Sequence, residues 1–176
     1  MLGRLEEIKL IAQCAAADNR RAFGKLVEVY QDSLRRYLYS LTNGDAALTD
    51  DLAQDTFIKA YESIRSFKCL SGFGTWIYRI AYNEYISWKR TCHPMVDESY
   101  IPENSSVKGQ ISADIRHDIG VALNSLPDIE RSLVLLFYLE DKKIKEIVKI
   151  TGLPEGTVKV YLSRARQKMF NQLNEL

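Results

Sequence analysis

Hydrogen-bond donors gather on one surface of the segment 154–169 (PEGTVKVYLSRARQKM), which carries a single acid, Glu155. The donors are Lys159, Ser163, Arg164, Arg166, Gln167 and Lys168. Apolar residues recur opposite them at steps of four, three and four, as one buried stripe of a helix: Val158, Leu162, Ala165 and Met169. A basic amphipathic helix is most often only a solvated face, but these donor types also bind DNA phosphates and base edges. The segment is therefore a candidate DNA-binding helix.

The residues before this segment predict the remainder of a helix-turn-helix. The stretch 143–150 (KIKEIVKI) has the spacing of a short amphipathic helix, for which Asp141 is the expected cap. Gly152 can adopt the left-handed conformation that ends this helix, and Pro154 suits the start of the next, where its missing N–H would be unused. This order is typical of a unit that places its second helix in the DNA major groove. We therefore favour DNA binding over a merely solvated face.

The whole chain is predicted to be all-α, because helical periodicity dominates and long alternating strand patterns are absent. Its 176 residues, of which 46% are hydrophobic, suffice for two small helical domains. The stretch 93–111 breaks the pattern with two prolines and a Ser-Ser pair, and is predicted to be a flexible linker. The predicted domains are therefore 1–92 and 112–176, and the second contains the helix-turn-helix.

Several further helices are expected from spacing and capping signals. In the first domain they cover 5–17, a segment capped by Asp18 that ends at Asn43-Gly44, and the stretches 46–66 and 75–90. The apolar side of the first is predicted to be Leu5, Ile8, Ile11, Ala12 and Ala15. In the second domain, one helix follows Ser112 and another starts at Pro127-Asp128. We expect the first two of these helices, which end before Asn43-Gly44, mainly to build the core of the first domain.

Charge is segregated along the chain, although the net charge is only +1 from 24 basic and 23 acidic residues. The stretch 43–58 holds no basic residue and four acids: Asp45, Asp50, Asp51 and Asp55. Acids near a helix start complement the helix dipole, but an acidic surface can also bind a basic partner. Charge alone leaves these two interpretations open. The contrast with the basic segment 154–169 predicts two surfaces with different partners.

The stretch 75–90 (TWIYRIAYNEYISWKR) mixes aromatic, basic and amide side chains. An inward stripe is predicted for Ile77, Ile80, Ala81 and Trp88, and an exposed or semi-exposed strip for Thr75, Arg79, Tyr82, Asn83, Ile86 and Arg90. Aromatic rings can stack on unpaired bases while cations follow phosphates, so the strip suits single-stranded nucleic acid. An aromatic stripe is more often core, and we expect Trp76 and Trp88 to be core residues.

Several function classes lack their usual residues. Cys14, Cys69 and Cys92 are far apart without a Cys-x-x-Cys pair, so no disulfide framework or zinc site is predicted, which suits a reducing cytosol. His93 and His117 are expected to be ordinary surface residues. The start of the chain has charges within its apolar run, and no stretch is apolar enough to cross a membrane. With no phosphate loop or catalytic triad either, we predict no cofactor, no metal, no small-molecule substrate and no enzyme activity.

The acidic helix, the aromatic-basic helix and the helix-turn-helix occur in an order that resembles bacterial RNA polymerase sigma factors of the extracytoplasmic-function type. AFGKLVEVYQDSLRRYLYSL is similar to the opening of the family's first conserved domain, and DDLAQDTFIKAY to its polymerase-binding segment. FGTWIYRIAYNEYISWKR is similar to the segment that melts and reads the promoter −10 element. LNSLPDIERSLVLLFYLEDKKIKEIVKITGLPEGTVKVYLSRARQKM is similar to the −35-reading domain. In the −10 segment, the basic run at Lys89-Arg90 is shorter than the one usual in the family.

The resemblance implies three sets of site residues. Core polymerase would contact Asp51, Gln54, Asp55 and Phe57. The −10 element would contact Thr75, Trp76, Tyr78, Arg79, Tyr82, Asn83, Lys89 and Arg90. In the −35 element, Lys159, Ser163 and Arg164 are the candidates for base edges, whereas Thr157, Tyr161 and Arg166 suit phosphates.

As a member of this family, the protein would be a cytoplasmic transcription initiation factor. It would bind the clamp helices of the largest polymerase subunit and the flap, and would hold one promoter strand with a base in a pocket built by 68–74. An anti-sigma factor is common in the family, and none is encoded in the sequence. The alternative function is a one-component helix-turn-helix regulator, with residues 1–92 as a ligand or dimer domain. The sequence does not identify the promoters or the inducing signal.

Overall fold

The computed structural model describes residues 3–17, 19–92 and 113–175, which are helical throughout their ordered elements and contain no strand. The elements are α1 (Arg4–Ala17), α2 (Arg20–Leu41), α3 (Ala46–Ser63), a 3-10 turn η1 (Ile64–Ser66), α4 (Phe73–Cys92), α5 (Ala113–Asn124), α6 (Asp128–Val134), a π-helical turn η2 (Leu135–Leu139), α7 (Ile144–Thr151) and α8 (Glu155–Glu175). The predicted all-α class is confirmed. The predicted linker 93–111 lies outside the described residues.

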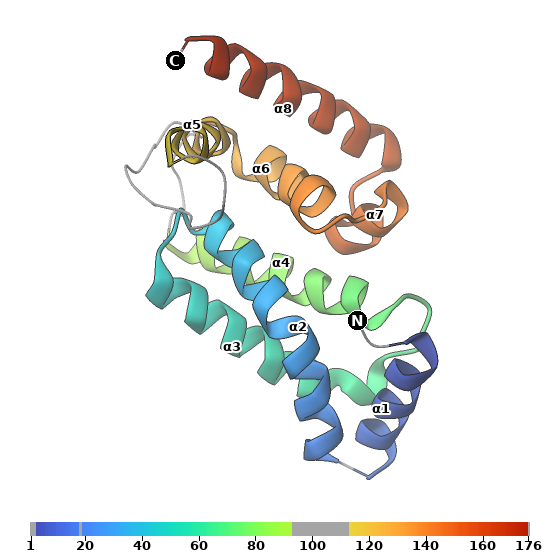
Figure 1. Cartoon of the computed structure of the whole chain (residues 1–176). Helices are drawn as coiled ribbons and strands as arrows, with labels where there is room; N and C mark the ends of the chain where they lie inside the picture. The colour runs from blue at the N-terminus through green and yellow to red at the C-terminus, as the bar shows by residue number, and fades with distance from the viewer. Residues whose placement is uncertain (1–2, 18, 93–112, 176) are drawn as a thin grey trace.

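The first domain is built on α2, α3 and α4, with α1 across one end of α2 (Figure 1). Asn19 caps α2 by accepting a hydrogen bond from the backbone N–H of Ala22, and Asp45 caps α3 through Leu48. Asp18, the cap expected from the sequence, lies outside the described residues. The completely buried side chains include Leu26, Leu34, Tyr37, Leu38, Phe73 and Ile77. Burial of each large apolar side chain contributes about 1.5–3 kcal/mol, so this core fixes the direction of α4.

The apolar side predicted for α1 is confirmed at Ile11 but is wrong at Leu5, Ile8 and Ala12. Leu5 is 78% exposed and Ala12 is also exposed, whereas Leu10, Ile11 and Cys14 are buried. These three residues also follow helical spacing, and they face α2 and η1. Since α1 has apolar residues on more than one side, its spacing alone could not show which side packs against the domain.

The second domain places α5, α6 and α8 around a common core, with α7 turning back before α8. The predicted turn is confirmed, because Gly152 has a φ of +75° and its N–H donates to the carbonyl of Val148. Asp141 does not cap α7. It occupies a left-handed position with φ of +48°, and the helix begins only after Lys143, whose N–H donates to the carboxylate of Glu146 over 3.0 Å.

The two domains pack against each other. Helix α7 lies along α4, while α6 and η2 contact α2 (Figure 1). The buried apolar residues of both domains form one continuous cluster. We call this packing of α6, η2 and α7 on α2 and α4 the closed arrangement. In the described parts of the chain, no helix is both long and apolar enough to span a membrane.

Candidate nucleic-acid and protein interfaces

Helix α8 presents its donors to solvent as the sequence predicts. Val158, Leu162 and Ala165 are buried, and Met169 is half-buried beside them. The exposed donors are Lys159, Ser163, Arg164, Arg166, Gln167 and Lys168. Thr157 and Tyr161 are half-buried at the edge of this surface. Because a buried stripe holds the helix to its domain, the opposite surface can enter a DNA groove without repacking the core.

The donors of α8 differ in whether they form ion pairs within the protein. Lys168 pairs with Glu130 over 2.9 Å, and the carboxylate of Glu130 is almost fully buried, so this lysine anchors α8 to α6. Lys159 pairs with Glu155 one turn earlier over 2.6 Å, and both side chains are exposed. An exposed pair of this kind is weak and can exchange for a phosphate or a base. Within the described part of the chain, Arg164 forms no ion pair, and its guanidinium remains available for a ligand.

The acidic residues at the start of α3 differ in their contacts and exposure. Asp45 caps the helix, and Asp50 forms an ion pair of 2.6 Å with Arg35, whose guanidinium lowers the pKa of that carboxyl. Asp51 and Asp55 are exposed, as is Gln54 between them, and Phe57 is half-buried. The helix-start interpretation therefore holds for Asp45, whereas binding of a basic partner by the exposed acids stays a prediction. Asp51, Gln54 and Asp55 form an outward surface suited to a basic partner.

The predicted −10 residues of α4 divide into two groups. Arg79, Asn83 and Arg90 are exposed and lie along one side of the helix, while Trp76 and Lys89 are half-buried. The rest are buried: Thr75 is 5% exposed, Tyr78 1% and Tyr82 6%. The predicted exposure of Thr75 and Tyr82 is therefore wrong.

The cause is packing by residues distant in sequence. Thr75 meets α7, and the ring of Tyr78 packs edge-on against Tyr37 of α2 with centroids 5.3 Å apart. Tyr82 lies one turn beyond Tyr78 and shares its side of the helix. Burial raises the pKa of Tyr82, Tyr85 and Tyr78, so these hydroxyls stay protonated. The hydroxyls of Tyr78 and Tyr85 donate hydrogen bonds to Glu140 and Asp128. Trp76, expected in the core, packs against Phe67 with centroids 4.8 Å apart.

Carboxylates of the second domain bind polar groups of the first. Glu146 on α7 accepts a hydrogen bond of 3.1 Å from Thr75, and Glu140 accepts one from Tyr78. Asp128 at the start of α6 accepts a hydrogen bond of 3.0 Å from Tyr85 and pairs with Lys89. No role is predicted for these acids from the sequence. Asp128 and Glu146 lie in the first turns of α6 and α7, where an acid is ordinary, and Glu140 follows η2 before α7, so no local signal distinguishes them.

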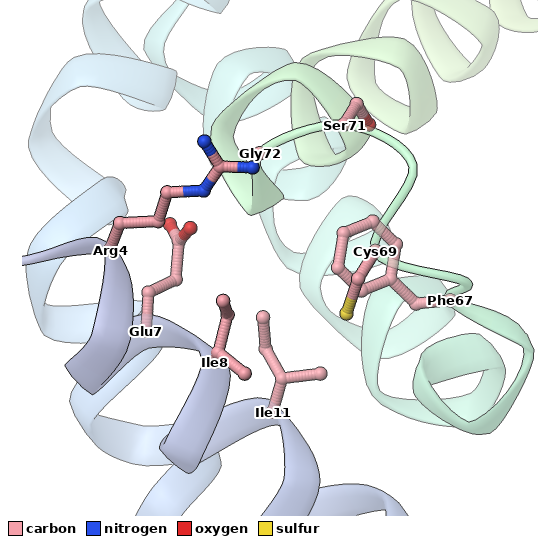
Figure 2. A pocket seen from close by; sticks show the side chains of 8 residues that line it. All are labelled: Arg4, Glu7, Ile8, Ile11, Phe67, Cys69, Ser71 and Gly72. Carbon is pink, nitrogen blue, oxygen red and sulfur yellow. The ribbon is translucent and has the colours of Figure 1, made fainter.

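A small pocket lies between α1 and the loop before α4 (Figure 2). Its volume of about 20 Å³ has room for roughly one water molecule. It is lined by Arg4, Glu7, Ile8, Ile11, Phe67, Cys69, Ser71 and Gly72. The carboxylate of Glu7 accepts a hydrogen bond from Tyr30, which ties α1 to α2 beside this loop. A nucleobase would need the loop to move, so the pocket predicted at 68–74 stays a prediction.

Among the described residues, no group of His, Cys, Asp and Glu is placed to hold a metal ion. Cys14 is buried, and Cys69 and Cys92 are exposed free thiols. The surfaces that the structure offers are therefore the α3 acids, the exposed side of α4 and the donor side of α8.

Comparison with known families matches two parts of the chain. Residues 26–92 match the family model described as Sigma-70 region 2, and residues 116–169 match Sigma-70, region 4. The ECF RNA polymerase sigma factor SigW of Bacillus subtilis is 31% identical over 96% of this chain and 97% of its own. The ECF RNA polymerase sigma-E factor of Escherichia coli is 30% identical over 90% of each chain.

Solved structures agree in fold. The sigma factor RpoE in complex with the anti-sigma factor NepR, from Bartonella quintana, has a TM-score of 0.71 at 26% identity, covering 86% of this chain and 96% of its own. CnrH in complex with the cytosolic domain of CnrY has a TM-score of 0.73 at 24% identity, covering 97% and 98% of the two chains. The likeness to CnrH concerns the fold alone.

Proposed function

The chain belongs to the RNA polymerase sigma factors of the extracytoplasmic-function type, and we propose that its two domains divide promoter recognition between them. A sigma factor is a transcription initiation factor that binds core RNA polymerase and promoter DNA, and this function displaces the one-component regulator as an alternative. In our proposal, the domain 1–92 binds core polymerase and the −10 element. The domain 112–176 binds the −35 element.

Core polymerase binds the exposed acids of α3. The contacts are Asp51, Gln54, Asp55 and Phe57, which would meet the basic clamp helices of the largest subunit. Support comes from the exposure of Asp51 and Asp55, neither of which is engaged in capping α3 as Asp45 is. Complementary charge across such an interface steers association and fixes its register. The flap of polymerase is the proposed partner of the second domain.

Helix α8 reads the −35 element in the duplex. Lys159, Ser163 and Arg164 lie on its exposed side and would contact base edges. Thr157, Tyr161 and Arg166 would contact phosphates and set the register of the helix on the groove. The observation that carries the proposal is this outward donor side, because its buried stripe leaves Lys159 and Arg164 no role in their own core.

Helix α4 holds one unpaired strand of the −10 element. The contacts are Thr75, Trp76, Tyr78, Arg79, Tyr82, Asn83, Lys89 and Arg90. Unstacking costs a few kcal/mol per base, and stacking on an aromatic side chain returns roughly 1–3 kcal/mol. Promoter opening can thus be driven by binding energy alone, so we propose no catalytic chemistry and no small-molecule substrate for this chain. Its place of action would be the cytoplasm, where polymerase and the genome meet.

A protein inhibitor is a further proposed partner. The solved RpoE structure is a complex with the anti-sigma factor NepR. By analogy, we propose that an anti-sigma protein binds this chain as well.

One reconstitution tests the proposal directly. The purified chain is mixed with sigma-free core polymerase and a genomic DNA library, and the new transcripts are sequenced. We expect transcription from a limited set of promoters that share a −35 and a −10 sequence. If the chain bound specific duplex DNA by itself and never associated with polymerase, the regulator alternative would be correct instead.

A further inference from the structure

Carboxylates of the second domain occupy groups of α4 that a nucleic acid strand would use. Of the proposed −10 contacts, Glu146 holds the hydroxyl of Thr75, Glu140 holds that of Tyr78, and Asp128 pairs with Lys89. Asp128 also accepts a hydrogen bond from Tyr85, one turn before Lys89. A carboxylate and a phosphate both offer negatively charged oxygen acceptors, so a hydroxyl or ammonium group that donates to one has less capacity for the other.

These contacts belong to a continuous interface. The side chain of Glu140 is 5% exposed, and besides Tyr78 it binds Arg36 of α2 at 3.1 Å. A buried carboxylate is stable only while it is paired and hydrogen-bonded, so Glu140 depends on the first domain for its partners. Lys149 of α7 also donates to the carbonyl of Leu70 at 3.2 Å and thereby reaches the loop before α4. The closed arrangement is thus held by polar contacts along much of α4.

The closed arrangement cannot engage a whole promoter. By their names, the −10 and −35 elements are centred roughly 25 base pairs apart, which is about 85 Å along B-DNA at 3.4 Å per base pair. Helices α4 and α7 are in direct contact, and α8 directly follows α7. One DNA duplex therefore cannot reach both α4 and α8 at these positions until the domains separate.

We propose that the second domain acts as an internal inhibitor of the free protein, with Asp128, Glu140 and Glu146 covering part of the −10 surface of α4 until the domains separate. This inference rests on the proposed function of α4. The donor side of α8 points away from the contact and stays exposed, so closure blocks the single-strand surface and leaves the duplex-reading surface open. Separation of the domains is then the regulated step that precedes capture of the −10 strand.

The test compares neutralised acids inside and outside the interface. Asp128→Asn/Glu140→Gln removes two interface charges with little change of shape, and Glu146 is left intact because it also binds the N–H of Lys143. Asp141→Asn is the control outside the interface and removes one charge: it is the exposed neighbour of Glu140, and Asn tolerates its left-handed backbone. Small-angle X-ray scattering of the full chain reports closure. Fluorescence anisotropy with a random-sequence 20-nucleotide single-stranded DNA reports access to α4.

We expect the wild-type chain and Asp141→Asn to have a radius of gyration of about 16 Å, the value for a compact chain of this length, and to bind the probe weakly. The double variant should be more extended and should bind at least about tenfold more tightly, because the competent state is no longer a minor one. A wild-type chain that is already extended, or a double variant that stays compact, would overturn the inference. A variant that opens without binding the probe better would instead refute the proposed role of α4.

Discussion

The hydroxyl of Tyr85 on α4 lies 3.0 Å from a carboxylate oxygen of Asp128 at the start of α6. The other oxygen of that carboxylate pairs with Lys89, four residues further along α4. Residues four apart share one side of a helix, so a single acid of the second domain engages both an aromatic and a cationic group. This relationship joins two regions that the promoter, in the proposed function, must hold far apart.

Arg164→Ala should relax promoter choice at one base position of the −35 element. The exposed guanidinium has the geometry for two hydrogen bonds to a guanine edge, and its loss should cost about 1–3 kcal/mol at that position alone. The measurement is holoenzyme binding to a panel of −35 duplexes, each with one substituted base pair. Uniform weakening on every duplex would contradict a base-reading role for Arg164.

Arg166→Ala is expected to act differently from its neighbour on α8. A phosphate contact carries no sequence information, so all duplexes should weaken alike. The loss of one phosphate contact should also reduce the slope of log K against log salt by about 1. Binding measured between roughly 50 and 200 mM salt checks this. A change confined to one base position would reassign Arg166 to base recognition.

Asp51→Lys should abolish capture by core polymerase while the fold stays intact. Asp51 is exposed on α3, so a lysine fits without repacking but repels a basic partner surface. Co-migration with core polymerase in size-exclusion chromatography and the circular dichroism of the free chain provide the two measurements. Glu62→Lys is the control, because it makes the same charge change at an exposed position near the other end of α3. Capture that survives in Asp51→Lys would remove the acidic surface from the proposal.

Asn83→Ala should reduce promoter opening more than it reduces core binding. Asn83 is exposed on the same side of α4 as Arg79, and its amide can bind an unpaired base, whereas α3 carries the proposed polymerase contacts. Permanganate reactivity of thymines in the promoter measures opening, and the chromatography above measures core binding. Equal losses in the two assays would argue that Asn83 supports the fold or the polymerase contact.

The sequence predicted those features that depend on neighbours along the chain. The stripe of Val158, Leu162 and Ala165 needs only the helical repeat, and the turn at Gly152 needs only its lack of a side chain. The exposed Arg164 follows directly from that stripe. These local rules were sufficient to identify α8 as a surface with exposed donors.

Features that depend on distant partners could not be predicted in this way. Thr75 shares a strip with Arg79 and Asn83 by spacing, but its hydroxyl meets Glu146, 71 positions away. The buried side of α1 was misassigned for a related reason: apolar residues occur around the helix, and only its contact with α2 selects Leu10 over Leu5. Helical spacing orders residues around an axis, and the identity of the packed side is set by tertiary contacts.

Gly152→Ala and Gly156→Ala should shift thermal stability in opposite directions, although the two glycines are four residues apart. A methyl group at either position meets open space, so backbone conformation decides the outcome. Gly152 has a φ of +75°, where alanine is strained by roughly 1–2 kcal/mol. Gly156 lies in the first turn of α8, where alanine is favoured by up to about 1 kcal/mol.

For a chain of this size, each kcal/mol of unfolding free energy corresponds to about 2–4 °C in Tm. Thermal unfolding followed by circular dichroism should therefore place Gly152→Ala below the wild type and Gly156→Ala at or above it; two equal losses would mean that the turn is not fixed by the left-handed residue.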